Sequence, residues 1–310
     1  PPTHTHGRGA AQEATRVDLD LVDMFRPVTK YSTMVDSPQS LALHLRRALR
    51  RALSGRRGPV HLNIPVDLWG QPLDEQWFDP KTYRSETTTF DRRAVQRAAD
   101  ALLSARYPVL LAGSGTRSAN AQQHLRALAE LLPARVATSP RAKGIFPEDH
   151  ALSLGVMGYA GHEQARDTIF GDEVDVLFTI GAALDETTTF SWDRRLLPQT
   201  ALLQLDIDQD QVGRNYPVDV PLVGDAQSIL TEIVYHLHRA MREGRAPASA
   251  WEEDGPLLRG AERSGQMEMR MSDADPVTPQ RWRSELQAVL PDDAIVFSDV
   301  GGHMLFNIKH

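Results

Sequence analysis

The chain has 310 residues, of which 41% are hydrophobic and 24% are charged, and its net charge is −7. At about 150 residues per domain this length suggests two domains, and the composition excludes disordered, collagen-like and coiled-coil chains. The chain contains no cysteine, which excludes disulfides, thiolate nucleophiles and Cys-ligated metal sites, and its negative charge argues against a nucleic-acid partner.

The first part of the chain predicts one helix and one strand. Over residues 37–53 apolar residues recur at helical spacing with arginines mostly on the other face, and Ser37-Pro38 is a suitable helix start. A glycine-containing turn over 54–58 then precedes an alternating strand over 60–64. We interpret the arginines of this helix as a solvent-exposed face.

The middle of the chain alternates helices with short apolar strands. Strands that are apolar nearly throughout and separated by helices are typical of a parallel sheet covered on both faces, so residues 91–241 predict a doubly wound α/β domain. Helices are expected at 92–105, 120–132 and 226–241, and strands at 109–112, 135–138, 174–180, 201–207 and 220–223. Two stretches without periodicity, 73–90 and 242–275, are interpreted as linkers. A further helix is expected at 280–290 and a further strand at 294–297.

A glycine-rich turn follows the first strand of the predicted central domain. Glycines in Gly113-Ser114-Gly115 would let backbone N–H groups approach a phosphate or a sugar. The third glycine of a dinucleotide fingerprint is replaced by Ser118, and the next strand ends in Thr138 and Ser139 instead of an acid that would bind the ribose. An NAD dehydrogenase is therefore disfavoured, and a purely structural tight turn remains an equal alternative.

Other glycines and acids follow the remaining predicted strands. Gly181, Asp206 and Asp225 stand at carboxyl ends of parallel strands, where open α/β sheets bind their ligands. The segment 154–158 contains two more glycines that would let backbone approach a ligand. Together these positions predict a nucleotide-shaped crevice, with turn formation alone as the alternative. His303, after Gly301-Gly302, would bond an anionic group beside backbone amides, although a surface histidine is the simpler interpretation.

Several segments resemble one family when they are taken in order along the chain. Residues 25–30 (FRPVTK) and 54–67 (SGRRGPVHLNIPVD) are similar to the end of the pyrimidine-binding domain of thiamine-diphosphate enzymes of the acetolactate synthase group. Residues 141–150 (RAKGIFPEDH) and 205–208 (LDID) resemble that group's central domain, and 276–310 resembles the start of its diphosphate-binding domain. Each motif is weak by itself, but the ordered set covers almost the whole chain.

This resemblance implies a domain plan and an activity. It implies a pyrimidine-binding part at 1–72, a flavin- or nucleotide-binding-like central domain at 91–241 and the start of a diphosphate-binding domain at 276–310. The implied reaction is decarboxylation of a pyruvate-like 2-oxo acid with carboligation, in which thiamine diphosphate is the electron sink. The implied partners are a small-molecule substrate and further copies of the chain, in a homodimer or homotetramer, with no nucleic acid. No apolar run reaches the about 20 residues that cross a bilayer, and we expect a cytoplasmic protein without a membrane partner.

The resemblance also assigns site residues, position by position. Gln12 matches an active-site glutamine, and Gly302 and His303 match residues that approach the cofactor's diphosphate. The positions that match the family's flavin site are Arg56, Gly113, Ser114, Gly115, Leu154, Gly155, Gly181, Ala182 and Asp206. No metal ligand is expected in this chain, because the resemblance places the magnesium-binding motif after residue 310.

The sequence departs from the family in three places that bear on function. Ala11 and Val66 replace residues typical of acetolactate synthases, and Ala183 and Thr187 replace two arginines of flavin-binding members. FAD, another adenine nucleotide or an empty site therefore all remain open. The family's activating glutamate would precede residue 1, so the chain alone is expected to be inactive. The alternative is a non-catalytic nucleotide-binding or interaction module that retains the central fold.

Overall fold

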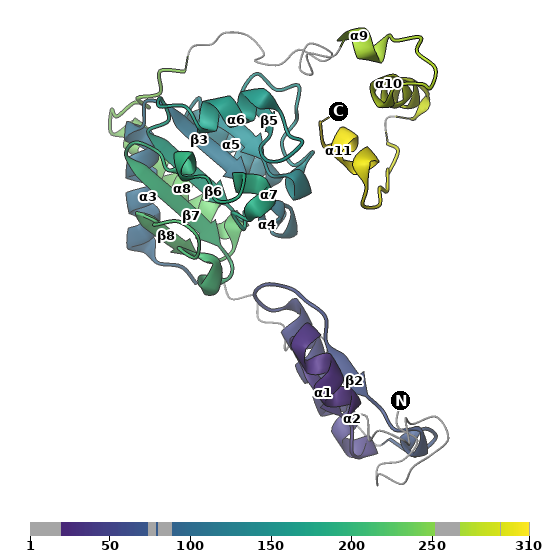
Figure 1. Cartoon of the computed structure of the whole chain (residues 1–310). Helices are drawn as coiled ribbons and strands as arrows, with labels where there is room; N and C mark the ends of the chain where they lie inside the picture. The colour runs from purple at the N-terminus through teal and green to yellow at the C-terminus, as the bar shows by residue number, and fades with distance from the viewer. Residues whose placement is uncertain (1–19, 74–78, 80–88, 252–266, 292, 310) are drawn as a thin grey trace. The chain divides into compact units, whose positions relative to one another are not determined.

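The computed structural model describes residues 20–73, 79, 89–251, 267–291 and 293–309 (Figure 1). Contacts divide the chain into two compact units, Pro1–Thr87 and Thr88–His310, and each is considered by itself. Among the helices of the described ranges, none has the length and apolar character that a membrane crossing requires. Gln12 lies outside the described residues.

The first unit is built from two parallel strands and the predicted amphipathic helix. Its elements are α1 (Leu21–Phe25), η1 (Arg26–Val28), β1 (Ser32–Met34), α2 (Pro38–Leu53), β2 (His61–Asn63) and η2 (Val66–Leu68), with β1 paired to β2. Helix α2 starts where the sequence predicts, and the N–H of Ser37 donates to Ser40 Oγ at 3.4 Å. It buries Ala48 and exposes Arg47 and Arg50, as the pattern predicted, but Leu49 of the predicted apolar face is 39% exposed and Ala42 is buried instead.

The central domain contains one six-stranded sheet in which every pairing is parallel. Its strands are β3 (Pro108–Ala112), β4 (Arg135–Thr138), β5 (Ser153–Val156), β6 (Val176–Ile180), β7 (Ala201–Asp206) and β8 (Val220–Val223). They lie in the order β5-β4-β3-β6-β7-β8, so the chain runs outward in one direction from β3 and then in the other from β6. This is the doubly wound arrangement, and its topological switch point lies between β3 and β6.

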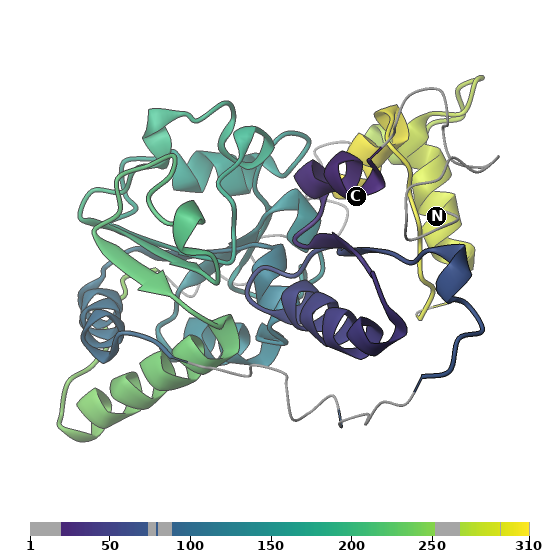
Figure 2. The same cartoon turned by 90° about the horizontal axis from the view of Figure 1, so that it is seen from below.

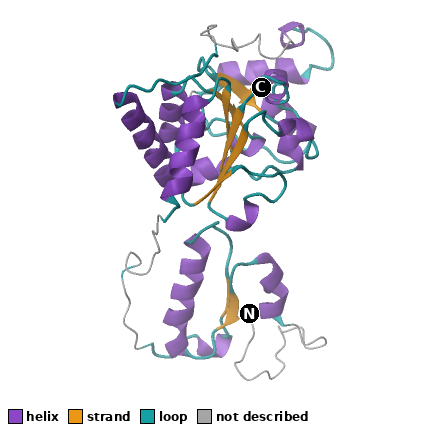
Figure 3. Ribbon diagram, turned by 90° about the vertical axis from the view of Figure 1, so that its left-hand side faces the viewer, coloured by secondary structure: helices purple, strands orange, loops and turns teal. Residues whose placement is uncertain are grey.

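Helices cover both faces of this sheet, as Figure 3 shows with the strands in orange. One face packs against α3 (Arg92–Ser104), α5 (Gln122–Leu131) and α8 (Ala226–Arg242), and α8 lies alongside α3 in Figure 2. The other face packs against α6 (Glu163–Ile169), η5 (Arg194–Leu196) and the two apolar residues that flank α7 (Glu186–Thr189), which are Leu184 and Phe190. Alternate strand residues such as Leu110 and Leu111 enter opposite cores, which explains why the strands are apolar throughout.

Strand β5 was not predicted, because its sequence does not look like a strand. Gly155 in its centre has φ of +81°, and the pairing of β4 with β5 shifts register between Val136 and Ala137. A short edge strand with a glycine and an irregular register carries little β propensity. Its position is decided by pairing with β4.

The start of the predicted linker 242–275 packs against the central domain instead of running free. The Trp251 indole N–H donates to the Pro108 carbonyl at 2.9 Å, and its ring contacts Tyr107 edge-on at 5.1 Å between centroids. The N–H of Ala248 donates to Leu103 O at 3.0 Å, and Arg245 pairs with Asp100 at 2.7 Å. Residues 245–251 therefore form a strap along the domain.

The C-terminal part contains helices but lacks the strand expected at 294–297. Its helices are α9 (Met267–Arg270), α10 (Pro279–Val289) and α11 (Gly302–Lys309). Helix α10 matches the helix expected at 280–290 to within one residue at each end, and Thr278 caps it. Residues 294–297 are not in a strand, and Ile295 and Phe297 are 82% and 92% exposed. The prediction was wrong because a strand needs a neighbouring strand, and the described residues place none beside this segment.

Candidate functional site

The glycines singled out in the sequence meet at the topological switch point. A Cβ atom on Gly113 would lie 2.2 Å from the Gly181 carbonyl oxygen, and one on Gly115 would lie 2.7 Å from the Gly181 Cα. Gly181 itself has φ of +57°, which side-chain-bearing residues rarely adopt. The turns after β3 and β6 therefore contact each other backbone to backbone, and only glycine fits.

The N–H groups of these turns are already bonded within the protein. Gly113 N–H donates to Ile180 O at 2.8 Å, Gly115 N–H donates to Gly181 O at 3.0 Å, and Gly181 N–H donates to Leu205 O at 2.7 Å. These bonds extend the sheet beyond the formal strand ends. The structure thus brings Gly113, Gly115 and Gly181 together with β7, but it does not leave these three N–H groups for a phosphate.

The side chains around this edge also have structural partners. Asp206 Oδ1 accepts the N–H of Asp208 at 2.9 Å, and the carboxylate of Asp225 caps α8 by accepting the N–H of Ser228 at 2.9 Å. Ala182 is buried, whereas Ser114, on the short helix α4 (Ser114–Ser118), is exposed. Of the predicted edge residues, Ser114 is therefore the one whose side chain faces solvent most openly.

Leu154 and Gly155 lie two strands away from the switch point, on β5. The Leu154 side chain is 1% exposed, so a ligand would have to meet its backbone. A Cβ on Gly155 would lie 2.4 Å from His162 Nδ1, and this same nitrogen accepts the Val156 N–H at 2.8 Å. Gly155 makes room for a buried histidine that satisfies the backbone, which is a packing reason for this glycine.

The loop after β6 carries an acid, Asp185, between the two positions where the resemblance expects arginines. Burial raises the pKa of Asp185, but hydrogen bonds from Thr188 and Thr187 and the nearby Arg141 guanidinium outweigh it, so the pKa is lowered. The carboxylate accepts the Thr188 N–H at 2.9 Å and caps α7. Ala183 and Thr187 are exposed and contribute no positive charge.

Two cations near this edge, Lys143 and Arg117, already have partners. Lys143 Nζ lies 2.7 Å from Glu148, and the Arg117 guanidinium donates to the Lys143 carbonyl at 2.8 Å. Among the residues that the structure describes, no three His, Asp or Glu side chains gather as a metal site would require.

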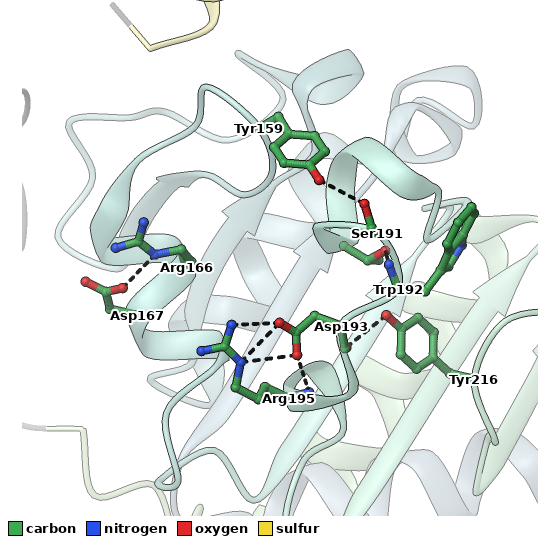
Figure 4. A network of polar contacts seen from close by, with 9 residues as sticks. Tyr159, Arg166, Asp167, Ser191, Trp192, Asp193, Arg195 and Tyr216 are labelled. Carbon is green, nitrogen blue, oxygen red and sulfur yellow. Dashed lines mark hydrogen bonds and ion pairs between the residues drawn. The ribbon is translucent and has the colours of Figure 1, made fainter.

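A polar network beside the sheet was not found from the sequence (Figure 4). Phe190, Ser191 and Trp192 all have positive φ, and the Ser191 hydroxyl lies 2.9 Å from the Tyr159 hydroxyl. The Asp193 carboxylate accepts a hydrogen bond from Arg195 Nη2 at 2.6 Å. The backbone carbonyl of Asp193 accepts a second one from the Tyr216 hydroxyl at 3.0 Å. Nothing in the sequence Phe-Ser-Trp signals three left-handed residues in a row.

The remaining predicted residues lie in other parts of the chain. Gly302 and His303 begin α11, both are exposed, and a Cβ on Gly302 would meet nothing within 4 Å. Arg56 lies in the first unit, where its carbonyl accepts the Lys30 ammonium at 2.7 Å. The binding roles of Arg56 and His303 stay predictions.

Comparison with known proteins supplies the family. The family model for the central domain of thiamine pyrophosphate enzymes matches residues 95–233, which are the doubly wound domain. The chain is 30% identical to the "Probable acetolactate synthase large subunit" of Methanocaldococcus jannaschii over 319 residues, covering 98% of this chain and 51% of that protein. The chain belongs to the acetolactate synthase-like family of thiamine-diphosphate enzymes.

Other members of this family differ in the reaction that their names describe. The chain is 32% identical to the "Probable sulfoacetaldehyde acetyltransferase" of Rhizobium meliloti, covering 96% of this chain and 51% of that protein. The crystal structure of benzoylformate decarboxylase from Polynucleobacter necessarius has a TM-score of 0.67 at 21% identity, covers 90% of this chain and 48% of its own, and supports the fold. The chain spans about half the length of the curated relatives that it matches.

Proposed function

We propose that the full-length protein is a thiamine-diphosphate-dependent carboligase that decarboxylates a pyruvate-like 2-oxo acid and joins the remaining fragment to an acceptor. The observation that carries this proposal is the likeness to an acetolactate synthase large subunit over 98% of this chain. It includes all three implied parts, the pyrimidine part, the central domain and the start of the diphosphate part. When bound, the cofactor would supply the electron sink for decarboxylation.

The residues proposed to hold the cofactor's diphosphate are Gly302 and His303. They begin the eight-residue helix α11, whose N-terminal N–H groups and dipole favour an anion. Gly302 leaves open space at its Cα, so a diphosphate would approach the backbone without a clash, and His303 is exposed beside it. These residues fit the role of binding and orienting the group. Gln12 is proposed as the catalytic residue of the pyrimidine part.

The test is consumption of pyruvate by the full-length protein. We expect consumption that requires added thiamine diphosphate and Mg²⁺ and that stops when both are removed by a chelator and gel filtration. The variant Gln12→Ala should lower kcat while the protein stays folded. A folded full-length protein that consumes no pyruvate or other 2-oxo acid would contradict the proposal and favour a non-catalytic module.

The identity of the acceptor molecule is the part of the reaction that the proposal leaves to experiment. Relatives at similar identity are named for acetolactate formation and for acetyl transfer, and this chain has Ala11 and Val66 at two departing positions. Product analysis by mass spectrometry after incubation with pyruvate tests for acetolactate, which forms from two pyruvate molecules with loss of one CO2 and needs no oxidant. Pyruvate consumption without acetolactate would indicate another acceptor. We further propose a cytoplasmic homodimer or homotetramer, which light scattering of the full-length protein would test.

A further inference from the structure

The turn between β3 and α4 is the place where a doubly wound domain would bind a dinucleotide. Binding there uses free backbone N–H groups and glycines that let the diphosphate come close. In this chain the N–H groups of Gly113 and Gly115 donate to Ile180 O and Gly181 O at 2.8 and 3.0 Å. A diphosphate that bound these two N–H groups would have to break the bonds, and the two carbonyls would lose their donors.

The space that the glycines leave is also filled. A Cβ on Gly113 would lie 2.2 Å from Gly181 O and 2.4 Å from the Ala182 Cα. A Cβ on Gly181 would lie 2.7 Å from the Gly115 Cα. The closest neighbour of each glycine is therefore protein backbone, so these glycines serve contact between the two halves of the sheet.

The charges at this edge do not favour a diphosphate either. Asp185 and Asp206 contribute carboxylates after β6 and β7, while Ala183 and Thr187 contribute no cation. Lys143 is paired with Glu148 at 2.7 Å, and Arg141 lies near Asp185. Arg117 donates to the Lys143 carbonyl at 2.8 Å, so two arginines balance the two carboxylates at this edge. A diphosphate carries at least two negative charges, so it would meet carboxylates without a surplus of positive charge.

We infer that Gly113, Gly115 and Gly181 form a backbone joint that ties the halves of the central sheet together, and that this edge does not bind the diphosphate of FAD or of another adenine dinucleotide. This inference goes beyond the proposed reaction and stands independently of it. The central domain then has a structural role, without a flavin of its own.

The direct test uses the full-length protein and FAD or ADP as the probes. We expect no flavin absorbance in the supernatant after the purified protein is denatured. In calorimetry we expect no heat of binding with FAD or ADP at about 1 mM, a concentration that would detect a Kd as weak as about 1 mM. Release of stoichiometric flavin, or a Kd in the micromolar range, would overturn the inference. Pyruvate consumption measured in parallel keeps this outcome separate from failure of the proposed function.

The joint is tested by paired substitutions. Gly113→Ala should lower Tm by about 10 °C or more, because backbone must move to admit a methyl group, whereas the exposed neighbour Ser114→Ala should shift it by less than about 2 °C. If Gly113→Ala does not fold, Gly115→Ala is the second variant. Its Cβ would lie 2.7 Å from the Gly181 Cα, a milder clash than at Gly113, so it should fold with a lowered Tm. A Gly113→Ala protein with unchanged Tm would contradict the joint.

Discussion

The backbone at Phe190, Ser191 and Trp192 illustrates how single residues are held in unfavourable conformations. All three have φ between +53° and +62°, a region that costs a residue with a Cβ about 1 kcal/mol or more. Trp192 N–H donates to Thr189 Oγ1 at 3.0 Å, and Asp193 N–H donates to Thr189 O at 3.0 Å. These bonds, with the Phe190 ring packed edge-on to Tyr159 at 5.0 Å, keep the segment in place.

This strain predicts a difference between two substitutions at Ser191. Both Ser191→Ala and Ser191→Gly remove the hydroxyl that meets Tyr159, but only glycine relieves the positive φ of +62°. We expect Ser191→Gly to be more stable than Ser191→Ala by about 1 kcal/mol in urea unfolding. Equal stabilities would mean that the left-handed segment is not strained.

Asp185 predicts a dependence of stability on pH. Its pKa is lowered in the folded protein, so its contribution is fully present above the ordinary aspartate pKa near 4 and is lost as pH falls through the lowered folded pKa. Asp185→Asn keeps a capping oxygen but removes the charge. The Tm gap between the native protein and Asp185→Asn should be largest near pH 7 and shrink below about pH 4. A gap that widens on acidification would contradict this sign.

At the scale of elements, the strap over residues 245–251 shows that a stretch without periodicity can be well ordered. These residues belong to the stretch 242–275, which is polar, lacks periodicity and therefore predicted a linker. Arg245, Ser249 and Trp251 each bond a group of the central domain, with Ser249 Oγ donating to Pro133 O at 3.0 Å. These contacts are long-range in sequence, so no local pattern reveals them.

The strap predicts graded losses of stability at Trp251. Trp251→Phe keeps the aromatic contact with Tyr107 but loses the bond to Pro108 O, which should cost about 1 kcal/mol. Trp251→Ala also loses the ring and its contact with Arg135, and should cost about 2–3 kcal/mol. Urea unfolding followed by circular dichroism measures both, and Tyr235→Ala, an exposed aromatic on α8, is the control expected to stay within about 0.5 kcal/mol. Equal losses of unfolding free energy for the two Trp251 variants would mean that the contacts of the ring do not stabilise the protein.

At the scale of the whole chain, the doubly wound domain is the part whose apolar strands are buried within the domain itself. It has two apolar cores, one on each face of a six-stranded parallel sheet, and each strand is hydrogen-bonded to a neighbouring strand of the same sheet. The C-terminal part differs, because Ile295, Phe297 and Val300 are more than 80% exposed. Apolar side chains so exposed indicate a segment whose packing partners are not among the described residues.

The sequence by itself determined the helices and strands that bury one regular face. The apolar strands of the central domain, the start of α2 after Ser37 and the presence of α10 all follow from local periodicity and helix-start signals. The ordered motifs also predicted the family. Tertiary structure alone decided β5, the strap and the left-handed segment, because each is stabilised by partners distant in the sequence. It also decided the glycine turn, where the N–H groups that the sequence offered to a phosphate are bonded to the neighbouring strand's carbonyls.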